Sequence, residues 1–173
     1  VLSRLLHGAR TAAVVGLTAL LVAVALGTTL GLLTGYYGKW VDALLSRFLD
    51  AFVVMPLLLV LLVVSTQMRH RHALEVGALI GGFAWPRLAR IARSETKRVV
   101  TLAYIDAAKL LGFSTPRILL CHVLPNVLAP LMIQAVFTLA SAVFMESALS
   151  FLGLGISTST ASWGALLRDA SLA

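Results

Sequence analysis

Residues 105–125 read IDAAKLLGFSTPRILLCHVLP and lie between two strongly apolar parts of the chain. The chain has a mean hydropathy of +0.97. It is 60% hydrophobic and only 12% charged, whereas an ordinary soluble domain has about 25% charged residues. This composition predicts an all-helical (all-α) membrane protein. The polar, glycine-broken stretch is therefore the exception that has to be explained.

Four apolar runs flank this stretch, and a bilayer core requires roughly 20 apolar residues in a helix. The runs cover residues 11–38, 51–68, 73–92 and 123–145. The third is the most polar, because it is interrupted by Glu75, Pro86, Arg87 and Arg90. We expect about four spans, all in one transmembrane domain that covers residues 1–173. Pro56, Pro125 and Pro130 are expected to kink the helices in which they lie.

The basic residues indicate which side of the membrane each loop faces. Nine of them lie in residues 36–50 and 87–122, namely Lys39, Arg47, Arg87, Arg90, Arg93, Lys97, Arg98, Lys109 and Arg117. The other five are Arg4, Arg10, Arg69, Arg71 and Arg168. The positive-inside rule places residues 87–122 in the cytoplasm, with both ends of the chain outside. In so apolar a chain, the net charge of +7 favours this sorting over binding of nucleic acid.

Small residues follow one face of the first run at four-residue steps. Gly27, Gly31 and Gly35 continue a stripe that begins at Ala19 and Ala23. In lipid, helices associate by close packing, so such a stripe predicts where another helix lies against this one. Gly77 and Gly81 repeat the spacing in the third run.

Residues 94–125, here called the projecting segment, are predicted to form two short helices at the cytoplasmic face. An apolar stripe of Leu102, Ile105, Ala108 and Leu111 indicates an amphipathic first helix, with Asp106 and Lys109 pointing away from it. Gly112 is expected to end this helix by adopting left-handed angles. Thr115 and Pro116 are expected to begin the second as N-cap and first residue. Leu124 and Pro125 then join it to the last span.

This pair of helices is shaped to enter a groove in another protein. Ala107 and Ala108 permit close approach, and an anionic Asp106 can meet an arginine of the partner. The order Asp106-Ala107-Ala108, Gly112 and Leu124-Pro125 resembles the EAA loop of permease subunits of bacterial ATP-binding-cassette importers. Two positions depart from that pattern. Asp106 replaces the usual Glu with a shorter side chain, and His122 replaces an Ile, which puts one apolar packing contact in doubt.

The resemblance extends over nearly the whole chain. The stretches LSRLLHGAR (2–10), GYYGKWVD (35–42), CHVLPN (121–126), ESALSFLGLG (146–155) and SWG (162–164) look like the C-type subunit of the dipeptide, oligopeptide and nickel permeases. The resemblance implies a type I importer transmembrane domain in the bacterial inner membrane. Members of that subfamily have one further span before this region and one after it.

By resemblance, this subunit and a second permease form the translocation pathway. Two cytoplasmic ATPases, which hold the ATP and Mg, bind the EAA loops, and an extracellular binding protein delivers substrate. The chain itself has no phosphate-binding loop and no catalytic motif, so we expect no cofactor and no enzymatic activity in it. Peptides are the first expectation for the substrate, with nickel or another small solute as the alternative. A channel or membrane enzyme without an ATPase partner is the alternative hypothesis, from a different class of function.

Four further features complete the sequence. Glu146, at the end of the last run, and Trp163 are candidates for a pathway or gate, although a solvated or loop-capping role is favoured for Glu146. Arg47 and Asp50 are expected to pair at the interface. The face formed by Arg87, Arg90, Arg93 and Lys97 is expected to reach lipid headgroups. The RHRH stretch (69–72) is read as solvated, and no metal site is expected.

Overall fold

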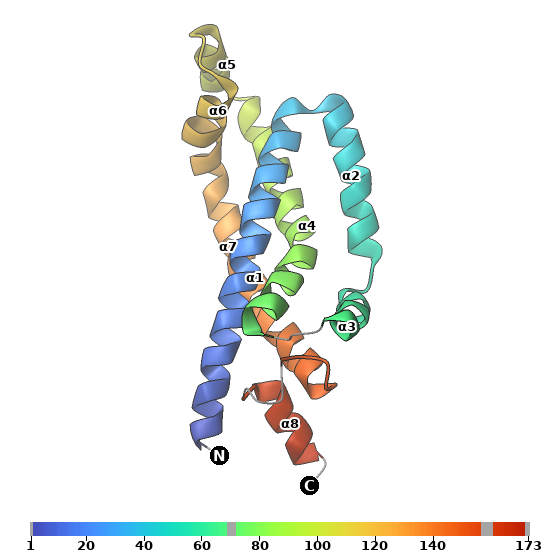
Figure 1. Cartoon of the computed structure of the whole chain (residues 1–173). Helices are drawn as coiled ribbons and strands as arrows, with labels where there is room; N and C mark the ends of the chain where they lie inside the picture. The colour runs from blue at the N-terminus through green and yellow to red at the C-terminus, as the bar shows by residue number, and fades with distance from the viewer. Residues whose placement is uncertain (1, 69–71, 157–160, 172–173) are drawn as a thin grey trace. The chain divides into compact units, whose positions relative to one another are not determined.

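The protein is helical throughout the part of the chain that the structure describes. This computed structural model describes residues 2–68, 72–156 and 161–171, and these residues contain no strand. The elements are α1 (Leu2–Tyr37), α2 (Lys39–Val54), α3 (Leu57–Gln67), α4 (Ala73–Val100), α5 (Ala103–Leu110), α6 (Thr115–Arg117), the π-helix η1 (Ile118–Val123), α7 (Leu124–Phe151) and α8 (Trp163–Ser171) (Figure 1). The prediction of an all-helical chain is confirmed.

Two helices are long and apolar enough to cross a bilayer by length and composition. They are α1 and the continuous helix Thr115–Phe151, which α6, η1 and α7 form together. Counting α2 and α3 as one broken span gives three among the described residues. α4 is not one of them, since its second half is rich in charged residues. The predicted spans 11–38 and 123–145 thus lie in clear apolar helices, whereas the count of four stays a prediction.

Residues 51–68 do not form the single spanning helix that their apolar composition suggests. α2 ends at Val54, α3 begins at Leu57, and Pro56 between them has extended angles (φ −67°, ψ 102°). Proline lacks a backbone N–H and disfavours helical angles at the residue before it. α3 has only 11 residues, a length of about 16 Å, against about 30 Å for the hydrocarbon core.

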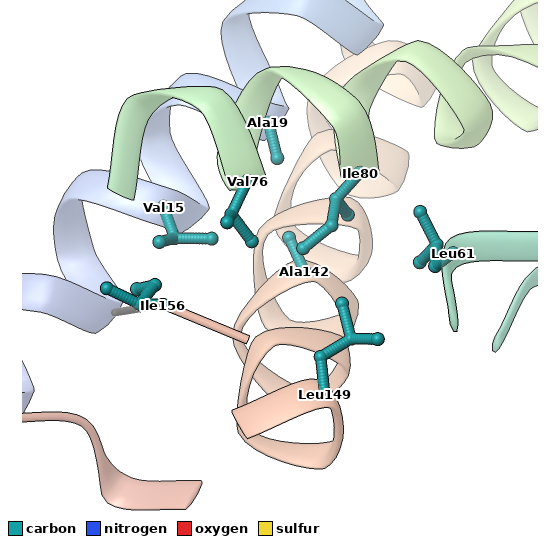
Figure 2. Close-up of a cluster of buried hydrophobic side chains, with 8 residues drawn as sticks. All are labelled: Val15, Ala19, Leu61, Val76, Ile80, Ala142, Leu149 and Ile156. Atoms are coloured by element: carbon teal, nitrogen blue, oxygen red, sulfur yellow. The ribbon is translucent and has the colours of Figure 1, made fainter. Parts of the chain in front are cut away.

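The described residues fall into two compact units, and each is described by itself. The first comprises the described residues of Val1–Ala23, Met55–Ala84 and Phe137–Ala173. Its core is a cluster of apolar side chains from α1, α3, α4, α7 and the segment after α7 (Figure 2). The cluster consists of Val15, Ala19, Leu61, Val76, Ile80, Ala142, Leu149 and Ile156. Apolar packing among these helices therefore defines the unit.

The second unit, Val24–Val54 and Trp85–Val136, is built on close packing of α1 against α4. A Cβ atom added to Gly27 would lie 2.6 Å from the Leu88 Cβ, and one added to Gly35 would lie 2.5 Å from the Thr96 Cβ. Between them, a Cβ on Gly31 would overlap Ala92 and the α4 backbone. Only glycine permits this approach, and Figure 1 shows these parts of α1 and α4 side by side.

The glycine contacts also show that α1 and α4 run parallel. In the second unit, successive turns of α1 face successive turns of α4 in the same direction. In the first unit, Gly77 faces Val15 and Thr18, and Gly81 faces Ala19 and Val22, again in the same direction. Two parallel helices that both cross a bilayer enter it from the same side.

Candidate functional site

The projecting segment contains the end of α4, then α5, a turn, and the start of the helix that continues into α7. Leu102 precedes α5 with extended angles (φ −80°, ψ 138°). The helix ends where Gly112 takes a left-handed φ of +77°. The Gly112 N–H then donates to the Lys109 carbonyl (3.0 Å) and the Phe113 N–H to the Ala108 carbonyl (3.1 Å). These bonds satisfy carbonyls at the helix end, as the sequence predicts for Gly112.

Only half of the predicted apolar stripe on α5 is buried. Ile105 and Ala108 are 0% and 4% exposed, and α5 packs against η1. Leu102 and Leu111, in contrast, are exposed, because they flank an eight-residue helix whose ends reach past the surface that covers it. The four-residue stripe is therefore wrong at both ends. Of the two alanines, Ala107 lies on the exposed face and Ala108 on the buried one.

The outer face of α5 combines one acidic side chain with bare leucines. Asp106 is exposed, and its Oδ1 accepts a hydrogen bond from the Lys109 Nζ at 2.9 Å. Leu110 is 89% exposed and Leu111 74%. Both leucines lie outside the two clear apolar helices. The end of α5 thus presents apolar surface that none of the described residues covers.

The second helix of the segment begins one residue earlier than the sequence predicts. Ser114 is its N-cap, with extended angles, and makes no side-chain capping bond, while Thr115 and Pro116 are its first two residues. The chain then forms the π-helix η1, in which the Leu124 N–H donates to the Leu119 carbonyl, five residues back. Pro125 explains the wider turn, because its ring crowds a carbonyl of the preceding turn and it has no N–H to donate.

His122, where the family pattern has Ile, makes an aromatic contact instead of an aliphatic one. Its ring stacks on Phe113, with 5.8 Å between the centroids and 15° between the planes. The Arg117 guanidinium lies over the Phe113 ring, 4.4 Å from the centroid. Phe113 is the first residue after Gly112, so these contacts hold the turn against the helix that follows it.

Three cations of α4 pair with carboxylates of α2 in the second unit. Asp42 accepts hydrogen bonds from Arg93 and from Lys97, the latter at 2.6 Å, and the Arg90 Nη2 lies 2.8 Å from the Asp50 Oδ1. The hydrogen bond with Asp42 raises the pKa of the Arg93 guanidinium. The expectations that these cations reach lipid headgroups, and that Asp50 pairs with Arg47, are therefore wrong.

We expect Asp42→Asn to weaken the contact between α2 and α4 and to lower the free energy of unfolding by about 1–2 kcal/mol. This is the range for hydrogen bonds to charged groups at a partly exposed site. The Asp42 side chain is only 16% exposed and bonds to two cations, so one substitution weakens both pairs. The measurement is the thermal unfolding midpoint of the purified protein in detergent. Asp169→Asn is the control, because that side chain is 58% exposed and lies 3.9 Å from Arg4. Equal midpoints for the two variants would contradict the expectation.

Glu146 is buried, so the solvated role is wrong, whereas the loop-capping role that was favoured beside it stays a prediction. The residue is 0% exposed, and its Oε1 accepts a hydrogen bond from the Ser150 Oγ at 2.7 Å. Ser147 and Ser162 also bond to the carboxylate. The Ser162 Oγ in turn accepts from the Ala165 N–H at 3.2 Å, which caps the start of α8. Glu146 therefore connects the end of α7 to α8.

Trp163, the first residue of α8, packs on the beginning of α1. Its Nε1 donates to the Leu5 carbonyl at 3.1 Å. A Cβ on Gly8 would lie 2.7 Å from the Trp163 Cδ1, so the indole lies directly against that glycine. The structure thus gives Trp163 a packing contact with α1.

Three of the RHRH residues, 69–71, lie outside the described residues. Within the described ranges, no group of three or more His, Cys, Asp or Glu side chains could hold a metal ion.

The structure also adds residues that the sequence did not single out. Tyr104 and Asn126 bond to each other across the projecting segment, and a polar residue directly after Leu-Pro was the available signal.

The two helices that are long and apolar enough to cross a bilayer define an integral membrane protein. The chain belongs to the family described as binding-protein-dependent transport system inner membrane component, which matches residues 27–172. The resemblance to importer permeases is thereby confirmed.

Its relatives are permease proteins of peptide transport systems. The chain is 37% identical over 171 residues to the dipeptide transport system permease protein DppC of Alkalihalophilus pseudofirmus, covering 98% of this chain and 55% of that protein. It is 34% identical over 169 residues to the di/tripeptide permease DppC of Pseudomonas aeruginosa (98% and 55%). It is 31% identical over 169 residues to the oligopeptide permease OppC of Mycobacterium tuberculosis (97% and 58%). The chain thus spans little more than half the length of these relatives.

Proposed function

We propose that this chain is part of the permease subunit of an ATP-driven peptide importer and contributes to half of the translocation pathway. Family membership and the printed names of the relatives, which are dipeptide, di/tripeptide and oligopeptide permeases, support this proposal. The remaining partners are a second permease subunit, two ATPases that carry ATP and Mg, and a substrate-binding protein. The bacterial inner membrane is the proposed location.

The parallel course of α1 and α4 supports a topology of four spans. If both helices cross, α2 and α3 together supply the return crossing, with the break at Pro56 inside it. The helix Thr115–Phe151 then crosses in the opposite direction to α4, since a single turned segment separates them. The excess of basic residues in 36–50 and 87–122 places the projecting segment in the cytoplasm.

The projecting segment is the proposed docking element for an ATPase. The observation that carries this proposal is the bare apolar end of α5, where Leu110 and Leu111 are 89% and 74% exposed beside the exposed Asp106. Exposed apolar side chains rimmed by charge mark protein contacts. Asp106, Ala107 and Leu110 would meet the partner, whereas Ala108, Gly112, Leu124 and Pro125 would shape the element that carries them.

Two substitutions test the docking. In the complex of permease and ATPase subunits, we expect Asp106→Lys to reduce co-purification of the ATPase by about tenfold or more, since like charges across an interface cost several kcal/mol. Gly112→Leu should have a similar effect, because a left-handed φ costs a side-chain-bearing residue about 1–2 kcal/mol and redirects α5. ATPase retained by both variants would contradict docking through α5. Failure of the unsubstituted chain to bind any ATPase would instead favour a channel or enzyme that needs none.

Matched controls separate docking from general damage. Asp169→Lys reverses a charge that is also exposed and that lies in α8, far along the chain from α5. Gly82→Leu adds the same side chain where a Cβ meets nothing within 4 Å. Both controls should keep the ATPase bound.

A further inference from the structure

The projecting segment is tied to the following helix by a closed set of hydrogen bonds. The Asn126 Nδ2 donates to the Tyr104 Oη at 3.1 Å and to the His122 carbonyl at 2.7 Å. The Tyr104 Oη lies 3.4 Å from that same carbonyl and donates to it. An amide nitrogen has two protons and a carbonyl oxygen has two lone pairs, so all three bonds can exist together.

These bonds join two elements that the backbone connects only through a turn. Tyr104 lies in the first turn of α5, Asn126 lies in the first turn of α7, and His122 lies in η1. Between α5 and α6, the chain passes through residues 111–114 and the left-handed Gly112. The buried contact of Ile105 and Ala108 with η1 is apolar, and apolar contacts have little directional preference. Hydrogen bonds, in contrast, depend on angle.

The attachment point is itself an irregular piece of helix. η1 has six residues in π-helical conformation, and it ends at Val123, two residues before Pro125. A π-helical turn and a proline both weaken the regular backbone bonding of a helix and mark the places where helices bend. The side chains of Tyr104 and Asn126 therefore brace the helix where its own backbone is least regular.

We propose that Tyr104 and Asn126 are positioning residues, which fix the angle between α5 and α7 so that a displacement of α5 turns α7 instead of bending the turn at Gly112. This inference rests on the proposed function, in which α5 receives the motion of an ATPase. In this proposal, Tyr104 and Asn126 determine how efficiently motion of α5 is transmitted to α7. The outer face of α5 alone binds the ATPase. The pair therefore matters after the ATPase has bound.

The direct test measures the distance between α5 and α7 in the assembled transporter. Spin labels are attached to cysteines at Lys109, whose side chain is 41% exposed and is not among those proposed to meet the ATPase, and at Met132 (63% exposed). The measurement uses a Cys121→Ser background in the reconstituted complex of permease and ATPase subunits. We expect a narrow distance distribution with Tyr104 and Asn126 in place. Tyr104→Phe or Asn126→Leu should broaden it. The double variant should resemble Tyr104→Phe, because that substitution alone already removes both hydrogen bonds that reach α5.

The functional readout is dialanine imported per ATP hydrolysed in proteoliposomes that contain the binding protein. Each variant should lower this ratio by at least about fivefold, the lower end of coupling between sites, while the amount of co-purified ATPase stays unchanged. Tyr37→Phe, which removes the hydroxyl of an exposed tyrosine at the end of α1, is the control and should change nothing.

The possible outcomes separate this inference from the proposed function. If the ATPase does not co-purify with the unsubstituted chain, the proposed function is wrong. If it does, and both variants keep the narrow distribution and the unsubstituted ratio, the inference about Tyr104 and Asn126 is wrong. Should the unsubstituted complex hydrolyse ATP without importing dialanine, the distance distributions alone decide.

Discussion

A leucine in place of Gly31 will force α1 and α4 apart in the second unit and lower the thermal unfolding midpoint of the purified protein. A Cβ at this position would overlap the Ala92 Cβ and also lie 2.7 Å from the Ala89 carbonyl oxygen and 3.0 Å from the Arg93 nitrogen. Backbone atoms of a packed helix cannot move aside singly, so even Gly31→Ala should be destabilising. Overpacking costs about 1–3 kcal/mol or more, and leucine should exceed alanine.

Two comparisons make this result specific to the helix contact. Gly82→Leu and Gly82→Ala place the same side chains on α4 where a Cβ meets nothing within 4 Å, so both should leave the midpoint nearly unchanged. Adding Ala92→Gly to Gly31→Ala should restore part of the loss, because it removes the nearest atom but not the Ala89 carbonyl. A Gly31→Ala variant as stable as Gly82→Ala would show that the two helices are not in contact here.

Patterns carried by a single helix were readable from the sequence. The α1 glycines at 27, 31 and 35 have the four-residue spacing of a packing face, and they pack against α4 in the structure. Gly112 ends α5 as expected, because glycine is the one residue that takes a positive φ without strain. The break at Pro56 could be predicted only in part from the sequence. The proline predicts a kink, but hydropathy averaged over residues 51–68 cannot show that the chain divides into two helices there.

Contacts between helices were harder to predict. Asp42 and Asp50 are eight residues apart, about two turns, and so lie on one face of α2. They match Arg90 and Lys97 on α4, yet a basic face leaving a membrane fits lipid headgroups equally well. The structure decides for ion pairs because α2 folds back along α4. The same holds for the bond between Tyr104 and Asn126, which lie 22 residues apart and share no pattern that a single helix reveals.

Removing the carboxylate of Glu146 will release the end of α7 from α8. In Glu146→Leu, the hydroxyls of Ser147, Ser150 and Ser162 lose their shared acceptor inside a buried site, and each buried polar group without a partner costs about 1–3 kcal/mol. Ser162 then no longer holds its capping position at the Ala165 N–H. We expect a markedly lower unfolding midpoint in detergent and faster proteolysis between α7 and α8.

Glu146→Gln distinguishes the hydrogen bonds from the charge. Its amide oxygen still accepts from a serine, and its NH2 group can donate to a second hydroxyl, which is donor and acceptor alike. If Glu146 acts by anchoring α8, the glutamine variant should stay close to the unsubstituted protein, and Glu75→Leu, at an exposed position in the first turn of α4, should do so too. A glutamine variant as unstable as the leucine variant would instead mean that the negative charge itself is what this site requires. In that case a compensating cation has to reach Glu146, since a buried carboxylate without one is costly.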